Sequence, residues 1–401
     1  MPNKDKNIPK RRFKAFENAD AWELRKIFEI ADRFDNLRVP IASSLRVSGS
    51  TPYYGANGIQ DYVEGYTHEG EFILVAEDGA NDLKNYPVNL VNGKIWVNNH
   101  AHVLQGKNSI ADNKFLAFSI NQTNIESLLV GGGRAKLNSD VLMNIELKLP
   151  SPAEQEAIGT FFSTLDQQIT LHQRKLDKLK SVKQAYLSEM FPAEGECVPK
   201  RRFPGFTDDW ELRKLGEVAR FRRGSFPQPY GNSEWYDGDG AMPFVQVADV
   251  TDEMNLVEDT KQKISKKAQP LSVYAEKGSV LVTLQGSIGR VAITQYGAFI
   301  DRTVLIFENF YLPIDNLFWA YVIKQKFIEE AKSAPGGTIK TITKEVLSDF
   351  NIKLPTHAEQ EAIGTFFSTL DRHITLHQRK LEKLKNLKKA LLNELFVWFS
   401  A

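Results

Sequence analysis

Two long stretches of the chain carry apolar residues at spacings that alternate between four and three. They lie within residues 150–191 and 355–396. This spacing places the apolar side chains along one side of an α-helix, as in a coiled-coil seam. About 38 residues at a rise of about 1.5 Å predict a helix of about 57 Å in each stretch. We expect the two helices to pack on each other as an antiparallel coiled coil; the alternative is an ordinary amphipathic core helix.

The seam contains two polar positions in each copy. In the first stretch its residues are Ile158, Phe162, Leu165, Ile169, His172, Leu176, Leu179, Lys183, Tyr186 and Met190. The second stretch has His377 and Lys388 at the places of His172 and Lys183. At the start of each helix, Ser151 with Glu154 and Thr356 with Glu359 predict a capping box.

The two stretches are copies of one another. At a constant offset of 205, 31 of the 42 positions are identical. A second pair of segments also repeats: Lys10–Phe13 reads KRRF, as does Lys200–Phe203, and the WELRK sequence of Trp22–Lys26 recurs at Trp210–Lys214. The whole chain is therefore a tandem duplication of a variable block followed by a helix, too long a unit to be one turn of a solenoid.

The variable blocks combine strand and helix patterns. Short β-branched runs such as Ile95–Val97 and Val291–Thr294, punctuated by Gly and Asn, predict strands and turns. Residues 115–120 and 317–332 predict helices. The expected fold class is α/β (α+β), with two similar mixed domains joined by the antiparallel helices in a pseudo-two-fold arrangement. The predicted segments are a first domain at 1–150, a helix at 151–192, a second domain at 193–355 and a helix at 356–401.

Composition narrows the class of protein only slightly. The chain has a net charge of +1, 42% hydrophobic residues and one cysteine, Cys197. It contains no apolar run long enough to cross a membrane and no signal sequence at its start, so a cytoplasmic protein is expected. The neutral charge by itself argues mildly against nucleic acid, and any DNA-binding surface must be a local basic patch.

The pattern of divergence suggests what the chain does. The helices stayed nearly identical while the domains between them kept their elements and changed their surfaces. Such a scaffold suits the recognition of two unlike targets at a fixed separation, as duplex DNA presents when symmetry-related modules read spaced half-sites.

The repeated helix AEQEAIGTFFSTLDQQITLHQRKLDKLK, the PYYGANGIQDYV segment at 52–63 and KIWVNNHAHVL at 94–104 resemble the specificity subunit of type I restriction–modification systems. The resemblance covers the chain from Arg11 to Phe396. It implies two target-recognition domains that each read half of a bipartite site in double-stranded DNA. It also implies a helical spacer, two modification subunits that methylate adenine with S-adenosylmethionine, and two restriction subunits that use ATP and Mg²⁺.

The chain itself is expected to be catalytically inert, without cofactor or metal. A Walker A loop and an adenine-methyltransferase loop are absent from the sequence. Asp140, Glu146 and Lys148 faintly resemble a nuclease set, but Glu146 becomes Asn351 in the second copy. His100 and His102 lack the cysteines or carboxylates nearby in sequence that a metal site needs. The Gly286–Arg290 turn is too short for a dinucleotide loop.

Candidate DNA-binding residues follow from the chemistry of base and phosphate recognition. In the first domain they are Tyr53, Tyr54, Asn57, Lys94, Asn98, Asn99, His100 and Arg134. In the second they are Arg222, Arg223, Ser225, Gln285, Ser287, Arg290, Arg302 and Lys340. Core packing of Tyr53 and Tyr54, and a solvated loop at Arg222–Arg223, are the alternatives.

Partner docking on the helices is expected at residues retained in both copies: Gln173, Arg174, Lys175, Gln378, Arg379 and Lys380. A solvated helix face, or a recent duplication, would also explain their identity. Two other classes of function stay open at this stage, an interaction scaffold without a DNA role and an enzyme with an unrecognised site. A scaffold would lack both a basic face and a deep pocket with converging titratable groups.

Overall fold

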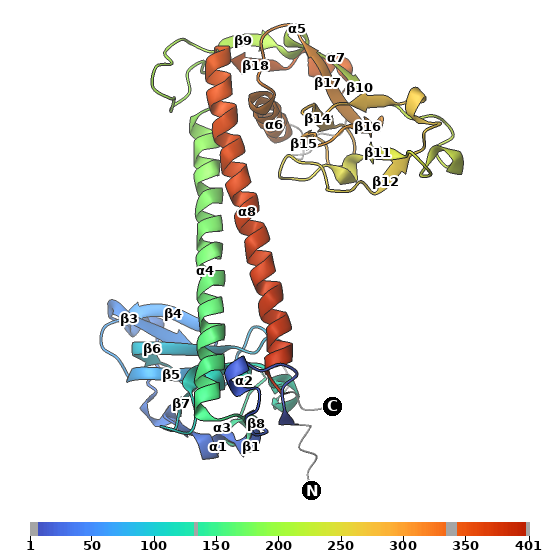
Figure 1. The fold of residues 1–401 in the computed structure, drawn as a ribbon. Coiled ribbons are helices and arrows are strands. Elements are labelled where there is room, and N and C mark those ends of the chain that lie inside the picture. The colour runs from blue at the N-terminus through green and yellow to red at the C-terminus, as the bar shows by residue number, and fades with distance from the viewer. Residues whose placement is uncertain (1–6, 132–134, 334–342, 398–401) are drawn as a thin grey trace. The chain divides into compact units, whose positions relative to one another are not determined.

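The computed structural model describes residues 7–131, 135–333 and 343–397 (Figure 1). The chain forms two compact units. Unit 1 comprises Met1–Gln173 with Arg379–Ala401, and unit 2 comprises Arg174–Gln378. Each unit therefore contains one variable domain together with half of each long helix. In the described ranges, no helix has both the length and the apolar character needed to span a membrane.

Unit 1 is built on a six-stranded sheet in the order β2-β7-β5-β6-β3-β4. All its neighbours are antiparallel except β3 and β6, which run parallel. The central strand β5 buries side chains on both faces, Ile73 and Val75 in one apolar cluster and Phe72 and Leu74 in another. The strands are β2 (Ala31–Arg33), β3 (Ser48–Gly55), β4 (Gly58–Val63), β5 (His68–Ala76), β6 (Val88–Val97) and β7 (Ala101–Gly106).

A strand pair and three helices complete the domain of unit 1. Strands β1 (Glu23–Lys26) and β8 (Glu146–Leu149) pair antiparallel. The helices are α1 (Ile27–Ile30), α2 (Asn113–Asn121) and α3 (Ser139–Met143), and α2 includes the predicted helix at 115–120. Short 3₁₀ turns lie at Lys14–Phe16, Asp35–Leu37, Ser43–Leu45 and Ile125–Leu128.

Unit 2 repeats this plan with a different arrangement of strands. Its two four-stranded sheets have the orders β10-β17-β14-β15 and β12-β11-β16-β13, and β9 pairs with β18 as β1 does with β8. The strands are β9 (Glu211–Lys214), β10 (Ala219–Arg223), β11 (Met242–Val245), β12 (Gln262–Ile264), β13 (Val273–Ala275), β14 (Val280–Thr283), β15 (Val291–Ile293), β16 (Ala298–Ile300), β17 (Val304–Phe310) and β18 (Asn351–Leu354). The helices are α5 (Leu215–Val218), α6 (Asn316–Ser333) and α7 (Lys344–Ser348), with 3₁₀ turns at Ser233–Trp235, Val247–Asp249 and Gln269–Leu271.

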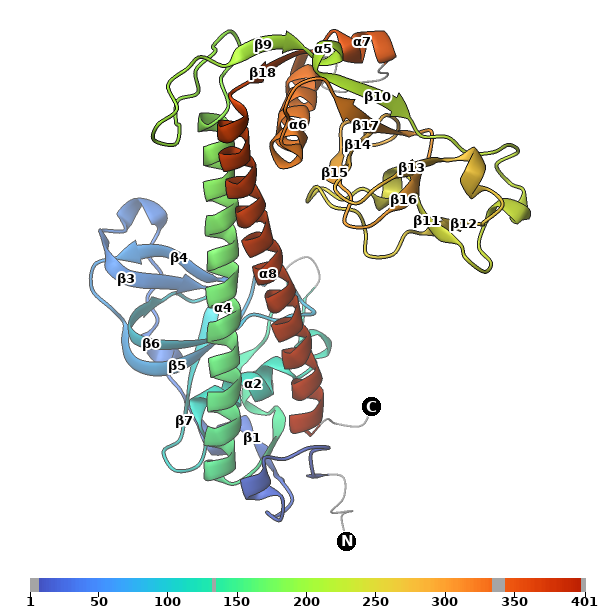
Figure 2. The ribbon, with the colours of Figure 1, turned by 45° about the horizontal axis from the view of Figure 1, so that its top comes forward.

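The two repeated stretches form α4 (Pro152–Glu189) and α8 (His357–Leu395), which run antiparallel (Figures 1 and 2). In unit 1, Lys388 Nζ of α8 lies 2.6 Å from an Asp166 carboxylate oxygen of α4. In unit 2 the equivalent pair, Lys183 of α4 and Asp371 of α8, forms the same bridge. The predicted antiparallel pairing is confirmed, and the lysines of the seam are explained by an aspartate on the facing helix.

Retained aromatic residues hold each helix end on a domain. In unit 1, Phe396 from the end of α8 stacks on Phe115 at a centroid distance of 5.4 Å and also contacts Trp22 and Phe162. Unit 2 repeats this set with Phe191, from the end of α4, against Phe318, Trp210 and Phe367. Each domain thus holds the start of one long helix and the end of the other.

The glutamate of each predicted capping box binds an arginine that is distant in the chain. Both carboxylate oxygens of Glu154 accept hydrogen bonds from Arg12, at 2.9 and 2.7 Å, and Glu154 is buried. Glu359 binds Arg202 in the same way at 2.9 and 2.6 Å. The repeated KRRF sequence therefore fastens the chain before each domain to the helix that follows it.

A glutamine and a glycine near the start of α4 also pack this helix against the domain. Gln155 donates to Pro150 O at 2.9 Å and accepts from Asp112 N at 3.0 Å, beside the first turn of α2. A Cβ at Gly159 would lie 2.6 Å from Asp112 Oδ1, so the helix approaches α2 closely only because this position is glycine. The equivalent Gly364 meets Asp315 in unit 2. Contacts within each unit thus account for much of the retained AEQEAIG sequence.

Candidate nucleic-acid interface

Three loops of unit 1 meet in a polar group that we call the first loop cluster: the turn at Asn57, the loop at 78–81 and the loop at 98–100. Asn57 Nδ2 donates to Gly79 O at 2.9 Å, and its Oδ1 accepts from Asn81 N at 2.9 Å. His100 Nδ1 lies 2.5 Å from Asp78 Oδ1. Loops that come from three different strand connections are therefore held together by their own side chains.

Two of the predicted DNA-binding residues in this region are buried and support the fold. Tyr53 is 1% exposed, its hydroxyl accepts a hydrogen bond from Ile41 N at 3.0 Å, and Arg46 lies over its ring. Asn98 is 4% exposed, and its Oδ1 accepts from His100 N at 2.8 Å. Tyr53 therefore belongs to the core and Asn98 shapes its loop, so neither is available to touch DNA in this conformation.

The other predicted residues of the first domain differ in exposure. Asn57, Lys94 and Asn99 are exposed, whereas Tyr54 and His100 are half-buried. Burial, with a smaller contribution from Tyr62, raises the pKa of Tyr54. Lys94 lies 4.6 Å from the ring centroid of Tyr66, away from the hydrogen bonds that join the loops. Arg134 lies outside the described residues.

Sequence reasoning missed the two loop residues that organise this cluster, Asp78 and Asn81. Asp78 is the second residue after β5, in the segment Glu77-Asp78-Gly79, and turn-forming residues at the end of a strand were the available signal. Their partners lie 22 and 24 residues away in the chain. Spacing in the sequence does not reveal such pairs.

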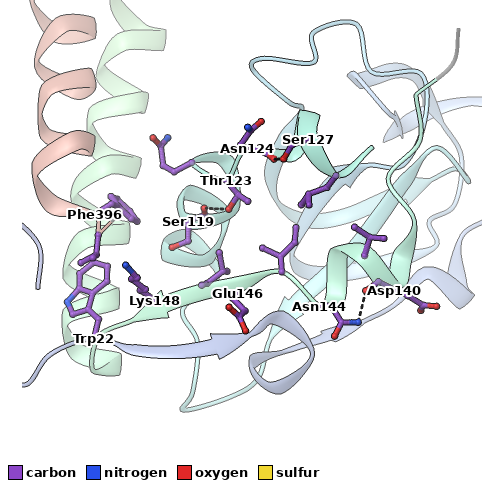
Figure 3. Close-up of a pocket in the computed structure, with 16 residues that line it drawn as sticks. Trp22, Ser119, Thr123, Asn124, Ser127, Asp140, Asn144, Glu146, Lys148 and Phe396 are labelled. Atoms are coloured by element: carbon purple, nitrogen blue, oxygen red, sulfur yellow. Dashed lines mark hydrogen bonds between the residues drawn. The ribbon is translucent and has the colours of Figure 1, made fainter. Parts of the chain in front are cut away.

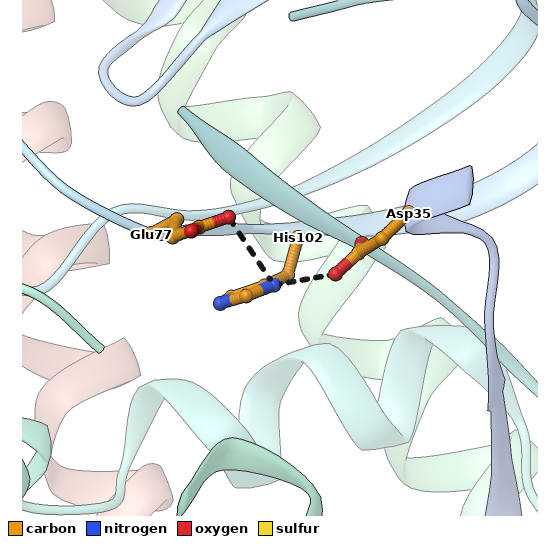
Figure 4. A group of neighbouring side chains, drawn as sticks. All are labelled: Asp35, Glu77 and His102. Atoms are coloured by element: carbon orange, nitrogen blue, oxygen red, sulfur yellow. Dashed lines mark hydrogen bonds and ion pairs between the residues drawn. The ribbon is translucent and has the colours of Figure 1, made fainter. Parts of the chain in front are cut away.

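Next to these loops, Asp35, Glu77 and His102 bring their polar atoms together (Figure 4). His102 Nδ1 is 2.7 Å from Asp35 Oδ2, and His102 Nε2 is 2.9 Å from Leu137 O. Both ring nitrogens thus lie within hydrogen-bond distance of oxygen atoms of the protein.

The carboxylates of this group also have basic partners. Arg38 and Lys136 lie 2.6 and 2.9 Å from Glu77. Burial alone would raise the pKa of Asp35, but its hydrogen bond to His102 and the neighbouring charges outweigh burial and lower it. Burial likewise opposes the lowering of the Glu77 pKa that Lys136 and Arg38 cause. The arrangement is an ion-pair network that ties the loops to the sheet.

In unit 2, three strand ends converge in a second loop cluster: residues 222–225 at the end of β10, residues 284–287 after β14 and residues 301–303 before β17. The backbone joins them, since Gly224 N donates to Val304 O at 2.9 Å and Leu284 N donates to Thr303 O at 2.8 Å. The exposed members are Arg222, Arg223, Gln285, Ser287 and Arg302. Residues predicted to bind DNA therefore come from three segments that are distant in the chain and close in the structure.

The environments of these residues are unequal. Arg302 lies 5.0 Å from the ring centroid of Tyr230. Arg222 is 3.7 Å from Glu308, so part of its charge is balanced locally. Arg290 is tied to Asp252 at 2.9 Å. Ser225 donates to Leu271 O at 3.2 Å.

Gly224 follows the predicted pair Arg222–Arg223, and Lys340 is the last predicted residue of the second domain. A Cβ at Gly224 would lie 2.1 Å from Ile300 O, so this glycine permits close approach of backbone to backbone. Lys340 lies outside the described residues.

On the helices, the retained positions predicted for partner docking are mostly accessible. Arg174, Lys175, Arg379 and Lys380 are exposed, and Gln173 and Gln378 are half-buried. Their accessibility is compatible with docking and equally with a solvated face.

The residues of the faint nuclease pattern, Asp140, Glu146 and Lys148, line one cavity of unit 1 (Figure 3). Among the described residues, only Asp35, Glu77 and His102 bring three metal-ligand atoms within 4.8 Å of one another. Asp140 and Glu146 are therefore not part of such a three-residue group in the part of the chain that the structure describes.

Comparison with known proteins agrees with this organisation. The family described as "Type I restriction modification DNA specificity domain" matches residues 19–181 and again residues 207–386. A putative type I restriction enzyme specificity subunit of Haemophilus influenzae is 32% identical over 375 residues, which cover 88% of this chain and 89% of the relative. The EcoDI specificity subunit of Escherichia coli is 20% identical over 87% of this chain and 82% of its own.

A solved structure has the same fold. The type I restriction–modification S subunit from M. genitalium superposes with a TM-score of 0.72 at 17% identity, and the match covers 98% of this chain and 100% of that one. The double family match and the full-length relative identify the chain: it belongs to the specificity subunits of type I restriction–modification systems, which recognise DNA and are not catalytic.

Proposed function

We propose that residues 1–150 and 193–355 are two DNA readers, each of which recognises one half of a bipartite site in double-stranded DNA. The observation that carries this proposal is the contrast within the duplication. The two domains share the arginine–glutamate pairs and the phenylalanine contacts that hold them on the long helices. In contrast, the first loop cluster is built from Asn, Asp and His and the second from Arg, Gln and Ser. Different donor and acceptor sets suit different base sequences.

In the first reader, the proposed DNA-facing residues are Asn57, Asn99, His100 and Lys94. Amide side chains can contact adenine edges with two hydrogen bonds, and lysine suits guanine edges or phosphate. Asn57 also holds Gly79 and Asn81, so it acts mainly by positioning its loops.

In the second reader, the proposed residues are Arg222, Arg223, Gln285, Ser287 and Arg302. Arginine recognises guanine with two hydrogen bonds, and serine suits phosphate. Concentrating arginine on one loop cluster supplies the local basic patch that the net charge of +1 does not provide.

The helix pair α4 and α8 is proposed to set the number of unread base pairs between the half-sites. Two modification subunits would dock on equivalent helical surfaces, with Gln173–Lys175 and Gln378–Lys380 as candidates, and would recruit two restriction subunits. S-adenosylmethionine, ATP and Mg²⁺ would be bound by those partners in the cytoplasm, where their DNA target lies.

The proposal is tested by mapping adenine methylation in cells that make this chain with its modification subunit. The expected result is a two-part motif with a fixed unread gap. Exchange of residues 20–149 for those of a relative should change one half of the motif and leave the other half and the gap unchanged.

Two outcomes would argue against the proposal. A change in both halves would contradict the assignment of one reader to each half. The absence of any motif that depends on this chain, with an active modification subunit present, would favour an interaction scaffold instead.

A further inference from the structure

The turn between β6 and β7 in unit 1 is fixed by Asn98. Its backbone nitrogen donates to Tyr54 O at 3.0 Å, and its Oδ1 accepts from His100 N at 2.8 Å. The carbonyl of His100 accepts from Glu77 N at 2.8 Å, on the segment that follows β5. These three bonds hold the residues on either side of Asn99, which lies in the middle of the turn.

The turn between β16 and β17 in unit 2 has the same three bonds. Asp301 N donates to Val245 O at 3.0 Å, and Asp301 Oδ1 accepts from Thr303 N at 2.9 Å. The carbonyl of Thr303 accepts from Leu284 N at 2.8 Å, on the segment that follows β14. Arg302 therefore lies in the middle of a turn that is built like the turn of unit 1.

The surrounding strands support this equivalence. β3 runs parallel to β6 as β11 does to β16, and β7 runs antiparallel to β5 as β17 does to β14. The segments after β5 and β14 each contain a glycine with positive φ, Gly79 at 71° and Gly286 at 63°. Asn99 and Arg302 thus occupy equivalent positions, although the two turns, Asn-Asn-His and Asp-Arg-Thr, share no residue type.

The side chains at these two positions are both available to a ligand. Asn99 and Arg302 are exposed, whereas Asn98 and Asp301 before them are buried. Within the part of the chain that the structure describes, neither exposed side chain forms a hydrogen bond or an ion pair. The guanidinium of Arg302 lies over the ring of Tyr230 at 5.0 Å from its centroid. Its N–H donors lie in its own plane, so this contact leaves them available to a further partner.

We propose that this turn is the same base-reading position in both domains, and that the residue in its middle sets the base recognised there. Asn99 reads an adenine of the first half-site through N6 and N7, and Arg302 reads a guanine of the second half-site through O6 and N7. This inference rests on the proposed function. It goes further by assigning one base pair in each half-site to one residue.

The test uses the full chain assembled with its modification subunits and the two exchanges Arg302→Asn and Asn99→Arg. Binding is measured by competition between a duplex with the parent two-part motif and duplexes in which each base pair of that motif is replaced in turn. Arg302→Asn should come to prefer A·T over G·C at one base pair of the second half-site, and Asn99→Arg should come to prefer G·C over A·T at one base pair of the first. At that base pair the preference should change by about 5- to 150-fold, the discrimination that a contact with two hydrogen bonds supplies.

Exposed residues outside both loop clusters supply matched controls. Arg213→Asn on β9 and Asn108→Arg in the turn after β7 make the same exchanges of residue type. Both variants should keep every base preference of the parent chain.

Arg302→Ala is a second test of the same contact. It should accept all four base pairs at the one position and keep the other preferences. Weaker binding to every duplex alike would instead indicate a phosphate contact and would overturn the assignment.

Failure of this inference differs from failure of the proposed function. Unchanged preferences in both exchange variants, or changes that fall in the same half-site, would overturn the inference while the two-part motif of the parent chain remained. A parent complex without any sequence preference would overturn the proposed function and this inference with it. Circular dichroism confirms that each variant is folded before binding is compared.

Discussion

Removing the hydroxyl of Tyr321 should weaken the packing of α6 on α8 in unit 2. This side chain is 3% exposed, and its hydroxyl donates to Asp371, which also binds Lys183. Burial and then the charge of Asp371 hold the pKa of Tyr321 far above its ordinary value, so the hydroxyl remains a donor at working pH. The Tyr321→Phe variant keeps the ring and removes only this hydrogen bond.

The expected loss follows from the geometry. A hydrogen bond to a charged group contributes about 1.5–3 kcal/mol to stability. Asp371 keeps its bridge to Lys183, and its side chain is 22% exposed, so water can replace part of the lost bond. We therefore expect a loss of about 1.5 kcal/mol, at the lower end of this range.

The duplication supplies the matched control. Phe118 occupies the equivalent place in unit 1, where Lys388 lies 5.3 Å from its ring centroid and binds Asp166. The same distance separates Lys183 from the ring of Tyr321. Phe118→Tyr should therefore add the missing bond and slow opening in unit 1. Tyr311→Phe, at an exposed tyrosine, should change nothing.

Hydrogen exchange read peptide by peptide measures these effects, because it reports the opening free energy of each unit separately. Peptides of α6 and of the first half of α8 should exchange about tenfold faster in Tyr321→Phe, the factor that corresponds to about 1.4 kcal/mol. An unchanged rate there, or an equal increase in peptides of α2, would refute the reasoning.

Three further predictions concern the attachment of α4 through Glu154, the ion-pair network of Asp35 and the proposed DNA contact of Arg302. Glu154→Gln should destabilise unit 1 by about 3–5 kcal/mol in urea unfolding because it leaves the buried guanidinium of Arg12 without its carboxylate partner. Glu23→Gln, in an exposed pair, should cost less than about 1 kcal/mol. The pKa of Asp35 is lower in the folded protein than its ordinary value of 3.8, so the ionised carboxylate stabilises unit 1 above pH 3.8 and this stabilisation is lost as the pH falls through the lower folded pKa. Acid should therefore destabilise unit 1, and Asp35→Asn should make its stability depend less on pH. An unchanged acid profile in this variant would contradict the prediction. Arg302→Ala should reduce the slope of log affinity against log salt by about 0.9 if this side chain contacts one phosphate, and binding titrations of the whole complex at several salt concentrations would show an unchanged slope if it does not.

Pattern and repetition in the sequence were sufficient for the main architecture. The alternation of four and three predicts α4 and α8 because it reflects helix geometry, which is local. The offset of 205 shows the duplication without any structure. Gln285 and Arg302, predicted from the sequence to bind DNA, are exposed, as turns between buried strands usually are; their contact with DNA stays a prediction.

Only the tertiary structure decided what individual residues do. Glu154 is predicted as a helix cap, but it binds Arg12, 142 residues away. Tyr53 is among the residues predicted to contact DNA, with core packing as the alternative, and it lies in the core. Lys183, unexplained in an apolar seam, is matched by Asp371 on the facing helix. Helix and strand periodicities depend on neighbours a few residues apart, whereas burial and ion pairing depend on which distant segments meet, and one sequence does not encode that in its spacing.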